Sequence, residues 1–299
     1  MRPQSDPDSL PASHIDTSAD GSPREQRSCL SARAALTGGL TELAWVGAHL
    51  LMYPLGTRTE QLRLDPRLRP GAQSPAVRAL FAGDPLAART PVLLVHGLID
   101  NRSTFAVMRR HLRRRGFTTV CSWNYSPFLT DVARGARDLG KHIERICRET
   151  GHDQVHIVGH SLGGLMARYY VQRQGGDRRV ATLVTIGTPH RGSALANVAP
   201  TALIRQLRPG SPVIRELELP APPLTTRITA IYSDMDQLVL PSPAGRCDHP
   251  DLRARNVLVR GVGHMSLLIH RTVLDEVVAT LTGVRRGAGT AASGVGAVA

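Results

Sequence analysis

The chain has 299 residues, of which 41% are hydrophobic and 4% aromatic, and this length fits one large domain with flanking tails. The formal net charge is +13, but Lys141 is the only lysine and the arginines are spread along the whole chain. Because the arginines are neither gathered in one patch nor interleaved with aromatic residues, a nucleic-acid partner is not expected. The one dense run, within residues 109–115, has the spacing of a solvated helix face.

The four cysteines of the chain show neither CxxC nor Cys/His ligand spacing. No metal site is indicated, no cofactor is expected, and free thiols are the default. Spacing alone leaves one disulfide open.

The amino-terminal part of the chain divides into three segments. Residues 1–33 are rich in proline and polar residues and are predicted to be a disordered tail. Residues 34–56 are mostly apolar, and we expect their core, residues 34–54, to form a helix that packs on the domain or lies at a membrane surface. A membrane-spanning anchor is less favoured, because Glu42 and His49 are costly in hydrocarbon, and a cleaved signal is least favoured. A cytoplasmic or membrane-associated protein is therefore favoured over a secreted one.

Residues 57–89 are predicted to be a connector, and residues 90–283 the main domain. There, short β-branched runs alternate with amphipathic segments, which is typical of βα units on a parallel sheet. The helix after residue 130 has five apolar positions on one face, with Thr130 or Asp131 and Gly151 as its caps. Residues 284–299 are predicted to be a second disordered tail. The runs expected to be strands are Val92–Val95, Thr118–Trp123, Val155–Val158, Val180–Ile186, Arg227–Tyr232 and Asn256–Val259.

The pentapeptide Gly159-His160-Ser161-Leu162-Gly163 carries the strongest chemical signal. A strand is expected before Ser161 and a helix after it, so this G-x-S-x-G sequence fits a sharp turn that exposes a nucleophilic hydroxyl. The alternative is an ordinary glycine-rich turn, which the flanking elements disfavour. The amide of Leu162, at the start of the helix, could stabilise negative charge on a reacting carbonyl oxygen.

A serine hydroxyl needs a base to remove its proton, and His264 is our candidate because it follows the last expected strand in Gly261-Val262-Gly263-His264. The imidazole in turn needs a carboxylate to fix its tautomer. Asp236 is our choice, with Asp234 as the rival on the same loop. The order Ser161, Asp236, His264 agrees with the chain order of this kind of site.

A second amide donor is expected after the first strand, in Val95-His96-Gly97-Leu98. Gly97 allows the backbone to turn so that the amide of Leu98 faces the substrate carbonyl, whereas His96 is predicted to be structural.

Together these motifs resemble the small bacterial lipases and esterases of the α/β-hydrolase superfamily, including the minimal Bacillus type. The resemblance covers about residues 90–282 and also includes Gly187-Thr188-Pro189-His190-Arg191-Gly192, where His190 is expected to shape the site without transferring protons. It implies an α/β-hydrolase fold, in agreement with the mostly parallel sheet of about six strands, with helices on both faces, that the apolar runs predict. The expected amino-terminal helical extension, through residue 56, departs from the family. The family pattern favours Asp236 over Asp234. The stretch 193–225 departs from it and is expected to form a lid or an acyl pocket.

The predicted function is hydrolysis of carboxylic esters, with a small-molecule ester or a lipid as substrate. The triad Ser161, Asp236 and His264 would act through an acyl-enzyme. An acyltransferase or thioesterase on the same triad stays open, because only the leaving group or the acceptor differs. A non-catalytic binding protein of this fold is disfavoured, because no member of the triad is missing.

Overall fold

The computed structural model describes residues 89–98, 100–126, 128–198 and 201–283. The predicted tails, the 34–56 helix and all but the last residue of the 57–89 connector lie outside the described residues. Among the residues that are described, no helix is both long and apolar enough to cross a bilayer.

Six parallel strands form one sheet in the order β2-β1-β3-β4-β5-β6. The chain runs outward from β1 to β2 and then returns to build the other half of the sheet from β3 onward, so the topological switch lies between β1 and β3. Ligands of such sheets bind at the carboxyl ends of the strands beside the switch. The strands are β1 Val92–Val95, β2 Val120–Trp123, β3 Val155–His160, β4 Val180–Ile186, β5 Arg227–Ser233 and β6 Arg255–Val259.

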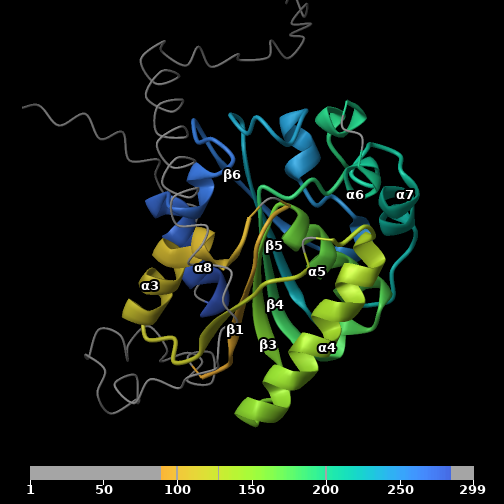
Figure 1. Ribbon diagram of the computed structural model, residues 1–299. Coiled ribbons are helices and arrows are strands. Elements are labelled where there is room, and N and C mark those ends of the chain that lie inside the picture. Colours follow the sequence, from red (N-terminus) through yellow and green to blue (C-terminus); the bar gives the residue numbers. More distant parts are fainter. Residues whose placement is uncertain (1–88, 99, 127, 199–200, 284–299) are drawn as a thin grey trace, which may run out of the picture.

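Helices cover both faces of this sheet (Figure 1). Helices α3 and α8 lie on one face, and α4 and α5 on the other. Short helices follow β4 and β5, and others precede α3, β4 and α8. The longer helices are α3 Ala106–Arg114, α4 Val132–Thr150, α5 Leu162–Arg173 and α8 Arg271–Leu281. The short ones are η3 Arg102–Phe105, η4 Gly176–Arg178, η5 Ala194–Asn197, α6 Ala202–Arg205, α7 Pro212–Glu218, η6 Ser242–Gly245, η7 Pro250–Leu252 and η8 Ser266–Leu268.

The pleat of the strands divides the interior into two hydrophobic cores. Along β1, Leu93 and Val95 point into the core beneath α4 and α5, whereas Val92 and Leu94 point into the core beneath α3 and α8. Because successive side chains of a strand point to opposite faces, a strand covered on both sides must be apolar throughout. This is why β1 stands out in the sequence as a continuous apolar run.

Helix α4 begins and ends where its sequence predicts. The side chain of Asp131 accepts a hydrogen bond from the Arg134 amide at 2.6 Å, and Gly151 ends the helix in the left-handed conformation with φ of 70°. Of the two candidates for the start, Asp131 is therefore the cap.

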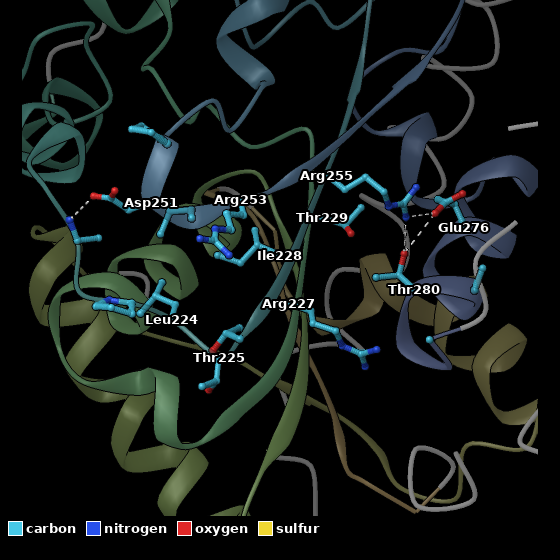
Figure 2. Close-up of a pocket in the computed structure, with 17 residues that line it drawn as sticks. Leu224, Thr225, Arg227, Ile228, Thr229, Asp251, Arg253, Arg255, Glu276 and Thr280 are labelled. Atoms are coloured by element: carbon cyan, nitrogen blue, oxygen red, sulfur yellow. Dashed lines mark hydrogen bonds and ion pairs between the residues drawn. The ribbon is translucent and has the colours of Figure 1, made fainter. Parts of the chain in front are cut away.

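A groove of about 980 Å³ lies where β5 and β6 begin. These amino-terminal ends of the strands form the amino edge of the sheet, opposite the carboxyl edge where the strands end. Figure 2 shows the lining of the groove, in which Arg255 reaches Glu276 and Thr280 on α8. Arg227, at the first position of β5, donates to the Thr182 hydroxyl at 3.0 Å. The polar side chains of this amino edge thus contact one another.

Candidate active site

Ser161 lies between β3 and α5 with φ of 52° and ψ of −122°. A non-glycine residue with positive φ costs about 1–3 kcal/mol unless its surroundings enforce the conformation. Two hydrogen bonds hold this turn, one from the Ser161 amide to the Ile186 carbonyl at 2.9 Å and one from the Thr188 hydroxyl to the Ser161 carbonyl at 3.1 Å. The side chain is half-buried at the carboxyl end of β3.

The glycines on either side of Ser161 allow the backbone to pack closely. A Cβ atom on Gly163 would lie 2.4 Å from the carbonyl oxygens of both Val95 and His96. One on Gly159 would lie 2.6 Å from the Cα atom of Gly164. The turn therefore needs glycine at these positions because β1 and α5 leave no room for a side chain.

Asp236 and His264 form a buried pair after β5 and β6. The Oδ2 atom of Asp236 lies 2.8 Å from Nδ1 of His264, and the two residues are 4% and 2% exposed. The Oδ1 atom accepts from the amides of Leu238 at 2.8 Å and Val239 at 2.9 Å. Burial alone would raise the pKa of Asp236, but the charge and hydrogen bond of His264 and the two amides outweigh it, so this pKa is lowered from its usual value.

The rival carboxylate, Asp234, contacts other groups. It accepts from the amide of Gly261 at 2.7 Å and lies 3.6 Å from the guanidinium of Arg260. Both contacts are within the loop that leads to His264. Asp234 thus ties this loop to β5, whereas Asp236 is the carboxylate that meets the imidazole.

The His264 imidazole lies beside the turn that carries Ser161. Its ring centroid is 4.6 Å from that of His160, the residue before the serine, and Nε2 of His160 is 3.4 Å from the carbonyl oxygen of His264. Gly187, with φ of 54°, fits against the other side, where a Cβ atom would lie 3.1 Å from both His264 Nδ1 and Asp236 Oδ2. Four strands, β3 to β6, thereby bring the serine, the imidazole and the carboxylate to one edge.

The two predicted amide donors flank Ser161. Leu162 is the first residue of α5, and amides in the first turn of a helix have no intrahelical partner. Leu98 lies in the turn after β1, and a Cβ atom on the neighbouring Gly97 would be 3.1 Å from the Cβ atom of Ser161. Both amides therefore belong to segments that pack directly on the serine.

His190, in the loop after β4, is buried and neutral. Burial, reinforced by the charge of Arg168, lowers the pKa of His190 well below its usual value. Its Nε2 lies 2.8 Å from the Thr185 hydroxyl and its Nδ1 lies 3.4 Å from the Arg168 guanidinium. Because the guanidinium can only donate, the proton of the ring is on Nε2.

Sequence reasoning gave no role to two residues that support this edge. Arg168, 3% exposed on α5, donates to the carbonyl of His190 at 3.0 Å and to that of Leu217 at 2.8 Å, and so ties α5 to α7 and to the loop after β4. The only signal in the sequence is an arginine within an apolar helical stretch. Thr188, which holds the Ser161 carbonyl, gave no signal beyond its place in the resemblance.

No three His, Cys, Asp or Glu side chains come together to hold a metal ion within the described part of the chain. Cys121, Cys147 and Cys247 are free thiols and are buried.

A sequence model of the alpha/beta hydrolase fold matches residues 90–208. Aspergillus fumigatus lipase B superposes with a TM-score of 0.58 at 19% identity, covering 80% of this chain and 67% of that one. Bacillus licheniformis lipase BlEst2, in its mature form, superposes with a TM-score of 0.55 at 15% identity, covering 65% and 92%. The chain is an α/β-hydrolase-fold protein. The predicted fold class, with its six-stranded parallel sheet and helices on both faces, is confirmed.

A curated relative extends the likeness from fold to sequence. The triacylglycerol lipase of Burkholderia plantarii is 35% identical over 134 residues, which are 42% of this chain and 36% of that lipase. This chain therefore spans little more than a third of the length of that lipase.

Proposed function

We propose that this protein hydrolyses carboxylic esters with Ser161 as the nucleophile. The observation that carries the proposal is the buried Asp236–His264 hydrogen bond of 2.8 Å, at the same sheet edge as a serine with positive φ. A strained serine on a strand-to-helix turn, followed along the chain by an acid and a base in contact, is what acyl transfer at this fold needs. The similarity to a triacylglycerol lipase supports an ester substrate.

The reaction then follows from the roles of these groups. His264 removes the hydroxyl proton as Ser161 attacks the carbonyl carbon, and the amides of Leu98 and Leu162 stabilise the oxyanion. His264 next protonates the leaving alcohol, which departs and leaves an acyl-serine. His264 deprotonates a water molecule, which attacks the acyl carbon. The bond between this carbon and the Ser161 oxygen then breaks, His264 returns the proton to that oxygen, and the acid is released. Asp236 orients the ring and stabilises its positive charge throughout.

Exposed apolar side chains support an apolar ester or lipid as the substrate. Phe128, 88% exposed, follows β2; Val198, 84% exposed, follows β4; and Leu238, 52% exposed, follows β5. All three lie in segments that leave the carboxyl ends of strands, the same edge as Ser161. These side chains are our candidate contacts for the hydrocarbon part of such a substrate.

The test is hydrolysis of a panel of p-nitrophenyl esters by the wild type and by Ser161→Ala. We expect the variant to lose at least about 10⁴-fold in kcat, since removing a catalytic serine disables the whole triad. A fluorophosphonate should label the wild type and not the variant. Thr280→Ala, which removes a hydroxyl at the opposite edge of the sheet, is the matched control and should keep wild-type rates. Equal rates for Ser161→Ala and the wild type would refute the proposal.

Adding a competing alcohol distinguishes hydrolysis from acyl transfer. We expect free acid to be the main product, with water as the acceptor. If the new ester is the main product, the protein is instead an acyltransferase that uses the same serine.

A further inference from the structure

The carbonyl group of Gly97, in the turn after β1, accepts hydrogen bonds from two side chains. The hydroxyl of Tyr125 donates to it through a short hydrogen bond, and Nδ1 of His96 donates to it at 2.9 Å. The same tyrosine hydroxyl lies 3.4 Å from the His96 carbonyl oxygen. The peptide group between Gly97 and Leu98 is thus held from one side by side chains.

This peptide group carries the amide that the proposed function assigns to oxyanion binding. A peptide bond is planar and trans, so its C=O and N–H groups point in opposite directions within one plane. Fixing the direction of the Gly97 carbonyl therefore fixes the direction of the Leu98 N–H. A rotated peptide would turn that N–H away and would also break the hydrogen bonds from Tyr125 and His96.

We propose that Tyr125 is a positioning residue that orients the Leu98 amide for oxyanion binding by holding the Gly97 carbonyl. This inference rests on the proposed function. Donation into the carbonyl also polarises the peptide group and so strengthens the N–H as a donor. A preorganised donor stabilises a transition state because it does not have to reorient during the reaction.

The parallel pairing of β1 with β2 explains why a residue after β2 reaches this carbonyl. Val95, the last residue of β1, pairs with Trp123, the last residue of β2. Gly97 and Tyr125 are each two residues further along their strands. Because the two strands run in the same direction, residues that follow a paired position by the same number of residues lie side by side.

The tyrosine ring is itself held in place by aromatic neighbours. It stacks on the His96 ring with centroids 4.3 Å apart and an interplanar angle of 17°, and the Trp123 ring lies 5.6 Å away. The hydroxyl group is therefore presented by a packed side chain. A phenylalanine at position 125 would keep the stacking and remove only the donor.

The experiment compares Tyr125→Phe with the wild type on a soluble p-nitrophenyl ester. Rates are divided by the concentration of Ser161 that a fluorophosphonate titrates, so that a partly misfolded sample does not imitate the effect. We expect kcat to fall about 10-fold while KM changes less than about twofold, a smaller loss than the 10²–10³-fold that follows removal of an oxyanion donor itself. Affinity for a trifluoromethyl ketone, which forms an oxyanion on the serine, should fall in parallel with kcat/KM.

Tyr169→Phe is the matched control. It removes the hydroxyl group with which Tyr169 on α5 donates to Glu216 on α7 at 2.7 Å. It should leave both kcat and ketone affinity unchanged. The inference would be overturned if Tyr125→Phe kept the wild-type kcat and ketone affinity, or if both tyrosine variants lost them equally. Those outcomes leave the proposed function intact, because the proposed function depends on Ser161→Ala.

Discussion

Charged side chains occupy both edges of the sheet, but their surroundings differ. At the carboxyl edge, Asp236 and His264 are almost fully buried, and backbone amides bind the far oxygen of the carboxylate. At the amino edge, Arg255 meets Glu276 with the arginine side chain 53% exposed. Water screens the exposed pair at the amino edge but not the buried pair at the carboxyl edge. We therefore expect the loss of one partner to have a much larger effect at the carboxyl edge.

The largest expected effect is at the buried pair. Asp236→Asn should lower kcat about 10⁴-fold, because an amide favours the wrong imidazole tautomer and cannot stabilise the charged ring. Steady-state hydrolysis of a p-nitrophenyl ester measures this loss.

Asp234→Asn is the matched control for this substitution. Its Oδ1 atom can still accept from Gly261, so we expect kcat to stay within a few-fold of wild type. An equal loss in both variants would show that Asp236 has no special role.

The next effect concerns backbone packing at the carboxyl edge. Gly163→Ala should lower the free energy of unfolding by about 3 kcal/mol, because the added Cβ atom would overlap two carbonyl oxygens of the β1 segment and overpacked cores lose this much. Gly151→Ala, whose Cβ atom would meet nothing within 4 Å at φ of 70°, should lose only about 1 kcal/mol from backbone strain. Urea unfolding of both variants makes the comparison, and equal losses would contradict the packing argument.

The smallest effect is expected at the amino edge. Arg255→Ala should change the free energy of unfolding by less than about 1 kcal/mol, and 1 M salt should reduce the difference further, because the ion pair is exposed. Urea titrations at low and high salt measure both. A loss above about 2 kcal/mol would mean that this edge is as tightly coupled to the fold as the other one.

Much of the sheet could be predicted from the sequence because its inner strands β1, β3 and β4 are buried on both faces. Val92–Val95 and Val180–Ile186 have the predicted bounds, while the strand expected from Thr118 begins at Val120. Strand ends depend on pairing with a neighbour, which the sequence does not show.

Some residues of the site could likewise be predicted from neighbouring sequence, whereas others depend on tertiary contacts. Ser161 has a local signal, since its glycines and flanking elements are all within a few residues. Tyr125 had none, and Arg168 had only its place within an apolar helical stretch, because each acts on a carbonyl that only tertiary contact brings near. The catalytic roles of Ser161, Asp236 and His264, the oxyanion roles of Leu98 and Leu162, and a lid or acyl pocket in 193–225 stay predictions.

The chain order of the carboxyl edge also has a consequence for biosynthesis. The ribosome makes the strained Ser161 turn and both flanking amide segments well before it makes β6 and His264. A nascent or truncated chain that stops after β4 therefore contains the nucleophile without its base. On the proposed mechanism such a fragment cannot turn over esters, and ester hydrolysis would begin only after β6 has docked and has brought His264 to the carboxyl edge.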